Sequence, residues 1–134
     1  MAKAGVVAYY RFEEGSADSA ASAANSILDS SGIVPGTPSG DPIYRTAVPT
    51  SIIPQTGQAN TLCLQFSGAQ SIYFSTDFIL HDPTKNATIE FYLKASSLHG
   101  KSLLWSRSDD TDRNRFNSEF WDGDLHLDYR EIRS

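Results

Sequence analysis

Leu62-Cys63-Leu64-Gln65-Phe66 begins the stretch, ending at Lys94, that decides the fold class predicted for this chain. Its two leucines and its phenylalanine recur at every second position, which is the period of a half-buried β-strand. The next four residues, Ser67-Gly68-Ala69-Gln70, are typical of a turn. A short apolar run follows at Ile72-Tyr73-Phe74. This pattern predicts antiparallel strands joined by tight turns.

The same alternation returns in the run from Thr88 to Lys94. Ile89, Phe91 and Leu93 are expected to face the core, and the residues that alternate with them are expected to face outward. This run therefore predicts a further strand.

Three predictions concern the first 57 residues. Val6–Phe12 is rich in β-branched and aromatic residues and predicts a first strand. Ala17–Leu28 has apolar residues at helical spacing, but they are small, so a short helix and a packed loop are both open. Asp29–Gly57 contains five prolines and four glycines, which restrict regular structure to short edge pieces, with Val48–Ile53 as the best candidate.

The last third of the chain has the clearest hairpin signal. Leu103–Arg107 and Phe116–Trp121 predict strands, and Asp122-Gly123 separates the second of them from another run, Asp124–Tyr129. Asp-Gly between alternating runs is a strong signal for a two-residue hairpin turn. With about seven strands and no βαβ spacing, the sequence predicts an all-β antiparallel sandwich.

Composition restricts the function. Sixteen acidic against eleven basic side chains give a net charge of -5, which disfavours nucleic acid as a partner. No apolar run approaches the roughly 20 residues of a membrane-spanning helix, so membrane insertion is not expected. The single cysteine, Cys63, excludes an internal disulfide and a multi-cysteine metal site. No signal peptide is visible after Lys3, although the mature domain of an exported protein would look the same.

Several short pieces of the chain, in order, resemble the bacterial laminin-G-like domains of the concanavalin A-like lectin/glucanase superfamily. They are Tyr9–Gly15, similar to that family's aromatic-x-Phe-(Asp/Glu)-Glu-Gly; Asp29–Gly32, similar to its Asp-Ser-Ser-Gly; Leu64–Gly68, similar to its Leu-x-Phe-x-Gly; and the strand-like runs Ala87–Lys94 and Leu103–Arg107. The resemblance implies one jelly-roll domain over residues 1–134. It also implies that this chain matches only the first half to two-thirds of the family's domain.

Such an incomplete jelly roll would have open strand edges and an uncovered inner face. We therefore expect a homo-oligomer, or completion by a missing segment. The resemblance further implies a structural calcium ion, with Asp29 among its ligands and carbonyl oxygens near Gly68 as partners. The alternative is that Asp29 caps a turn through nearby backbone.

Asp124, His126 and Asp128 recur at every second position of one predicted strand. Retaining glycoside hydrolysis needs two carboxyl groups about 5 Å apart, and residues two apart on a strand face are near that distance or a little beyond it. The family's hydrolytic pattern is Glu-x-Asp-x-Glu, whereas this chain has Asp-x-His-x-Asp. A glycan-cleaving remnant using Asp124 and Asp128 is therefore the alternative, and the polar outer face of a hairpin is the simpler interpretation.

Aromatic residues on the outward faces, among them Tyr92 and Trp121, are the candidate sugar-stacking platforms, with a second layer of core as the alternative role. The favoured function is a non-catalytic recognition module of an extracellular or cell-surface protein, binding carbohydrate or protein. A purely structural or assembly domain is the third hypothesis.

Overall fold

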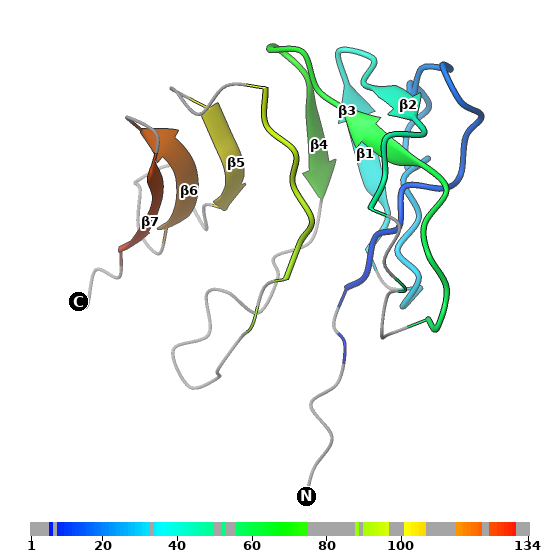
Figure 1. Cartoon of the computed structure of the whole chain (residues 1–134). Coiled ribbons are helices and arrows are strands. Elements are labelled where there is room, and N and C mark those ends of the chain that lie inside the picture. The colour runs from blue at the N-terminus through cyan, green and yellow to red at the C-terminus, as the bar shows by residue number, and fades with distance from the viewer. Residues whose placement is uncertain are drawn as a thin grey trace, which may run out of the picture. The chain divides into compact units, whose positions relative to one another are not determined.

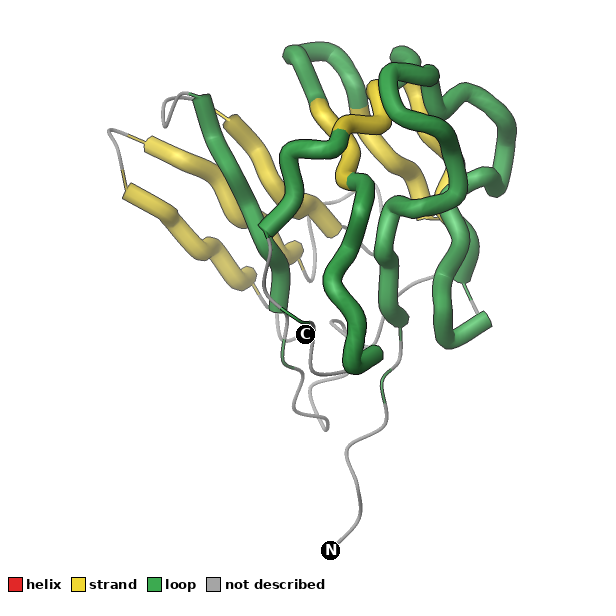
Figure 2. The backbone as a smooth tube through the Cα atoms, turned by 45° about the vertical axis from the view of Figure 1, so that its right-hand side comes forward, coloured by secondary structure: helices red, strands yellow, loops and turns green. Residues whose placement is uncertain are grey.

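The computed structural model describes the chain at positions 6, 8–32, 34–49, 52, 56–74, 88, 90–96, 101–106, 115–121 and 124–130, and over the last three ranges it describes the backbone. The chain divides into two units, Met1–Thr76 and Asp77–Ser134, each of which is described by itself. Strands and loops occur in the described residues, and no helix is found among them (Figure 2). This part of the chain is therefore all-β.

The first unit contains two separate two-stranded antiparallel sheets (Figure 1). One pairs β2 (Ile43–Arg45) with β3 (Cys63–Gln65). The other pairs β1 (Gly36–Ser39) with β4 (Ser71–Phe74). Along the sequence β2 and β3 lie between β1 and β4, and the chain bends between β3 and β4 at the predicted turn from Ser67 to Gln70.

The first unit has a small core. Its buried apolar residues are Ala21, Ile27, Val34, Tyr44 and Leu62, and Ile27 has no exposed surface. Tyr10, Phe12, Leu64 and Ile72 pack against this core and are partly buried. The inward face predicted for Leu62–Phe66 is therefore confirmed at Leu62 and Leu64, whereas Phe66 is 46% exposed.

Packing is tight where Ile27 meets β1. The two residues Ile27 and Gly36 exchange backbone hydrogen bonds of 3.0 and 2.7 Å. A Cβ atom at position 36 would lie 2.6 Å from the side chain of Ile72 and 2.7 Å from that of Phe74, closer than packed carbon atoms approach. A side chain at position 36 would therefore require Ile72 and Phe74 to move.

The predicted strand Val6–Phe12 is wrong at its described positions, where Tyr10 forms a single bridge with Asp29. Phe12 has φ of 59°, a left-handed conformation that ends an extended run. Over Ala17–Leu28 the packed loop is confirmed, because Asp18 and Asn25 also have positive φ, which a right-handed helix does not allow.

Short edge pieces within Asp29–Gly57 are confirmed, but they are β1 and β2. The predicted piece Val48–Ile53 is not a strand at its described positions, and the rest of it lies outside the described residues. Both observed strands start close to a proline or glycine and have a partner in β4 or β3. Strand partners, more than local propensity, decided where the pieces form.

The second unit contains a three-stranded antiparallel sheet in the order β5-β6-β7 (Figure 1). Its strands are β5 (Lys101–Ser106), β6 (Arg115–Trp121) and β7 (Asp124–Arg130). The predicted C-terminal strands are thus confirmed. Trp121 pairs with Asp124 at the closed end of the hairpin, and the two turn residues between them lie outside the described residues.

The run Thr88–Lys94 differs from its prediction. At its described positions it is not a strand, and Ile89 lies outside the described residues. Phe91 and Leu93 were expected to face the core, but they are 49% and 47% exposed. Alternation alone does not make a strand, because a strand also needs a neighbour to bond its N–H and C=O groups.

Candidate functional site

Among the residues that the structure describes, one charged residue is buried. It is Asp29, with 7% of its surface exposed. Its Oδ1 accepts hydrogen bonds from the backbone N–H groups of Tyr9 (2.8 Å) and Ser31 (2.9 Å). Its Oδ2 accepts from the Ser31 hydroxyl (2.5 Å) and from the N–H of Val34 (3.0 Å). One carboxylate therefore joins three separate points of the backbone.

These hydrogen bonds determine the charge of Asp29. Burial disfavours the ionised carboxylate and acts to raise its pKa, but the bonds from Ser31, Tyr9 and Val34 outweigh burial and hold the pKa well below its usual range. The carboxylate is therefore ionised at neutral pH. For the neighbouring Tyr10, burial first and then the Asp29 charge raise the pKa above its ordinary value.

The Asp-Ser-Ser-Gly segment forms a turn that is closed by both the side chain and the main-chain carbonyl of Asp29. Besides the side-chain bonds, the Asp29 carbonyl accepts a 2.8 Å hydrogen bond from the N–H of Gly32, whose φ of 82° suits glycine. Ser30 donates its N–H to the Tyr9 carbonyl at 2.7 Å. The turn-capping alternative for Asp29 is the role that these contacts show.

Calcium takes six to eight oxygen ligands, and a carboxylate serves it through lone pairs. Each Asp29 oxygen already accepts at least two hydrogen bonds, so this carboxylate as arranged does not fit a calcium ligand. Gly68, the other predicted partner, is exposed with φ of 139° in the turn after β3. Among the described residues no group of three His, Cys, Asp or Glu side chains is placed to hold a metal. Calcium binding stays a prediction.

Glu13 is a second structural carboxylate, and sequence reasoning did not find its partners. It accepts from the N–H groups of Thr61 and, at 3.4 Å, Leu62, and it forms a 3.1 Å ion pair with Arg11. Arg11 in turn donates from Nε to Asn60 Oδ1 (3.2 Å), and Asn60 donates back to the Arg11 carbonyl (2.7 Å). This network ties the N-terminal segment to the start of β3.

Glu14, the next residue, also accepts hydrogen bonds from distant parts of the chain. It accepts from the N–H of Leu28 at 3.2 Å and from the Tyr44 hydroxyl at 3.5 Å. Burial, followed by the charge and hydrogen bond of Glu14, raises the pKa of Tyr44. The carboxylates of Glu13 and Glu14 therefore hold loops of the first unit together.

A shallow hollow of about 200 Å³ lies beside the hydrogen bond between Glu14 and Tyr44. It is lined by Glu14, Gly15, Ser19–Ala23, Ser26 and Tyr44. The Ser26 hydroxyl is buried and has no hydrogen-bond partner in the described part of the chain. Most of the lining side chains are small and neutral, so the hollow contains one charged group, the Glu14 carboxylate already bonded to Tyr44.

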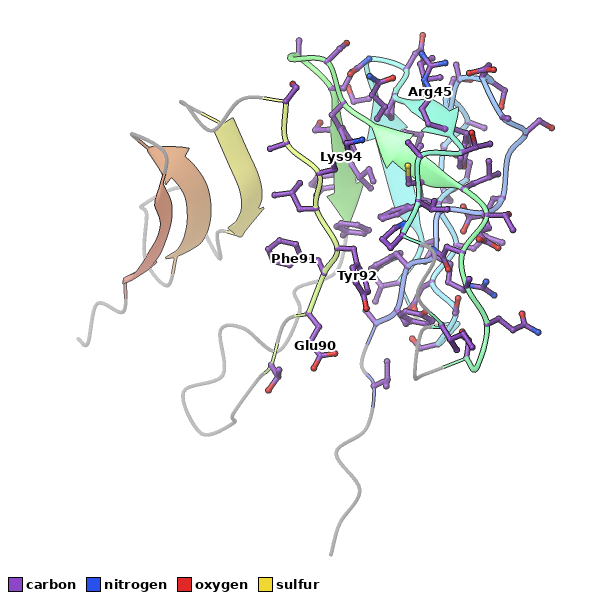
Figure 3. All side chains as sticks on the ribbon, in the orientation of Figure 1. Arg45, Glu90, Phe91, Tyr92 and Lys94 are labelled. Atoms are coloured by element: carbon purple, nitrogen blue, oxygen red, sulfur yellow. The ribbon has the colours of Figure 1, made fainter. Side chains whose placement is uncertain are left out.

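Tyr92, one of the two predicted ligand-binding residues, is 65% exposed. Figure 3 shows it on the opposite side of its segment from Phe91. Trp121, the other, is the last residue of β6. In the first unit Tyr73 of β4 is equally open, with 68% of its surface exposed. The described residues therefore present aromatic rings to solvent in both units.

The predicted acidic residues Asp124 and Asp128 both belong to β7, with His126 between them. They are four residues apart, which on a strand is roughly 13 Å, beyond the ~5–9.5 Å between the two carboxyl groups of glycosidases. The register places His126 opposite Glu119 of β6 and Asp128 opposite Asn117. The pair Asp124 and Asp128 is thus poorly spaced for glycoside hydrolysis.

Comparison of the chain with protein-family models, with curated proteins and with solved structures found no match. A search for membrane-spanning segments, limited to the described residues, found no helix with the length and hydropathy to cross a bilayer.

Proposed function

We propose that this chain is a non-catalytic recognition module of an extracellular or cell-surface protein, and that it binds carbohydrate through exposed aromatic rings. The observation that carries the proposal is Tyr92, an aromatic residue that keeps 65% of its surface open to solvent. The resemblance of its motifs to laminin-G-like domains supports the same function, and an incomplete jelly-roll sandwich is the fold we propose with it.

The physical argument concerns the ring. A tyrosine has a flat apolar face and a polar hydroxyl, which suits the mixed apolar and hydroxyl surface of a sugar. Burial of apolar surface is favourable by about 25 cal/mol per Å². An exposed ring therefore does not contribute this free energy to the stability of the isolated fold. A ligand that stacks on the ring recovers that free energy.

The test is binding of the full chain to a glycan array, followed by affinity electrophoresis in gels containing the polysaccharides that score. Tyr92→Ala should weaken retardation about 3- to 10-fold, since ring stacking contributes roughly 0.5–1.5 kcal/mol. Tyr92→Phe keeps the ring and should bind nearly as well. Trp121→Ala tests the second predicted residue.

Tyr73→Ala is the matched control, because Tyr73 has nearly the same exposure, 68%, and belongs to the other unit. A blank array, or binding that Tyr73→Ala removes and Tyr92→Ala does not, would overturn the proposal as stated. Capture of a protein ligand with a blank array would replace carbohydrate by protein as the partner.

Self-assembly is the second candidate, favoured by a separate observation. Phe91 and Leu93 are about half exposed, at 49% and 47%, on an extended segment that is not a strand. Apolar side chains in such a segment are suited to pairing with a second copy, which would also satisfy its backbone. Light scattering should show a dimer or larger species, and replacing both residues with serine should yield a monomer. A monodisperse wild-type monomer would exclude this function.

A further inference from the structure

The exposed segment at residues 90–94 has a side-chain pattern that is complementary to itself when its direction is reversed. Tyr92 is the central residue, Phe91 and Leu93 are its apolar neighbours, and the oppositely charged Glu90 and Lys94 come next. All five residues are exposed, and the segment belongs to none of the strand pairs that the structure describes. These residues are therefore accessible to a partner.

The segment has two sides of different chemistry. Successive residues of an extended chain alternate between its two sides, and Figure 3 shows Phe91 and Tyr92 on opposite sides of this one. By the same alternation, Leu93 shares the side of Phe91, and the two charged residues share the side of Tyr92. One side is therefore apolar and about half exposed, and the other side presents two opposite charges around a ring that is 65% exposed.

Antiparallel pairing of two copies of this segment, centred on Tyr92, matches side chains at all five positions. Each Glu90 would lie opposite Lys94 of the partner subunit, and each Phe91 opposite Leu93 of the partner subunit. The two Tyr92 rings would lie next to each other at the centre. Residues directly opposite in such a pair have Cβ atoms about 4.5–5.5 Å apart, and opposite-charge and aromatic pairs at that separation are stabilising.

Other arrangements of the two segments lose this match. A parallel pair in the same register would place Glu90 opposite Glu90 of the partner subunit, and Lys94 opposite Lys94 of the partner subunit. Like charges directly opposite each other are destabilising. An antiparallel pair shifted by one residue would place a charged residue opposite an apolar one, and a shift by two residues would remove both ion pairs. Charge complementarity therefore selects one direction and one register.

We propose that residues 90–94 form an antiparallel strand pair with the same residues of a second copy of this chain, with Tyr92 at the twofold axis. The inference rests on the self-assembly function proposed above, and it adds the direction and the register of the contact. A twofold interface uses the same patch on both subunits, so it closes after two chains and yields a dimer. Because a lone two-stranded pair is marginally stable in water, the dimer is expected to be weak and concentration-dependent.

The experiment is sedimentation equilibrium of the full chain at up to about 0.5 mM protein, in about 0.15 M salt. Reducing agent prevents a disulfide through the free cysteine Cys63. The wild type should show a monomer–dimer equilibrium. Glu90→Lys and Lys94→Glu each place like charges opposite each other at both ends of the pair, so each should weaken dimerisation about tenfold or more. The double variant Glu90→Lys/Lys94→Glu, and an equimolar mixture of the two single variants, restore both ion pairs and should dimerise like the wild type.

The net charge of the chain provides an internal control. Glu90→Lys reduces the negative charge and Lys94→Glu increases it, so general repulsion between subunits would shift dimerisation of the two variants in opposite directions. That result, or a double variant that does not recover, would overturn the register. If both single variants dimerise like the wild type while Phe91→Ser/Leu93→Ser is monomeric, self-assembly stands and this register is refuted. A wild type that is monomeric over the whole concentration range refutes both. Circular dichroism must show that every variant remains folded.

Discussion

Replacing Asp29 with alanine removes the carboxylate that accepts at least four hydrogen bonds, and tests whether this carboxylate organises the first unit. Three of the bonds come from backbone N–H groups, of Tyr9, Ser31 and Val34, which remain in place after the substitution. The variant therefore leaves donors without their acceptor, and does not merely shorten a side chain.

The magnitude follows from the burial of each donor. Val34 is 3% exposed, and a buried donor without a partner costs about 1–3 kcal/mol. The N–H groups of Tyr9 and Ser31 are part-buried, so water can replace the lost carboxylate as their acceptor. Each replacement costs about 1 kcal/mol. We expect Asp29→Ala to lower the free energy of unfolding by about 3 kcal/mol.

Asp29→Asn refines this test. Its amide oxygen can still accept from Tyr9 and Ser31, but its NH₂ group would face the N–H of Val34, so donor meets donor. We expect a loss of about 2 kcal/mol, mostly from this one contact. Asp18→Asn is the matched control, because Asp18 has 74% of its side chain exposed and that side chain forms a surface ion pair with Arg45.

The assay is urea unfolding followed by far-UV circular dichroism. With an m value of about 2 kcal/mol/M, Asp29→Ala should move the midpoint down by about 1.5 M, and the control by less than 0.5 M. Both tryptophans, Trp105 and Trp121, belong to the second unit, so their fluorescence reads that unit separately. If Asp29→Ala shifts the dichroism midpoint no further than Asp18→Asn does, the reasoning about this carboxylate is refuted.

Three further predictions follow from the first unit. Because its folded pKa lies below its unfolded value, Asp29 adds stability that is complete above about pH 5 and declines as the pH falls below about 4; Asp29→Asn should flatten that decline in acid unfolding curves. Gly36→Ala should cost roughly 1–3 kcal/mol in thermal unfolding, because its methyl group would overlap Ile72. Since the pKa values of Tyr10 and Tyr44 are raised, absorbance at 295 nm should show at least two of the six tyrosines protonated beyond about pH 10, where exposed ones ionise.

The C-terminal hairpin could be predicted closely because its signals are local. Asp122-Gly123 selects a two-residue turn, and that turn sets the register of Phe116–Trp121 against Asp124–Tyr129. The observed pairing of Trp121 with Asp124 is the one that this turn requires. Residues from one continuous stretch, Arg115 to Arg130, decided this part of the fold.

The candidate site at Asp29 was predicted only in part. The residue was found through its motif, but its partners are main-chain N–H groups, which every non-proline residue has and no sequence pattern marks. The same is true of Glu13, whose acceptor role depends on Thr61 and Leu62, about fifty residues away. Their pairing is a property of the folded chain.

The sequence by itself determined the all-β class, the predicted turn between Ser67 and Gln70, and the strands of the second unit, because side-chain alternation and turn chemistry are local properties. Tertiary structure alone decided that Tyr10, within the predicted strand Val6–Phe12, forms a bridge with Asp29 and that Phe91 and Leu93 remain half exposed. A strand exists only where another segment bonds its backbone, and the identity of that segment depends on how distant parts of the chain pack.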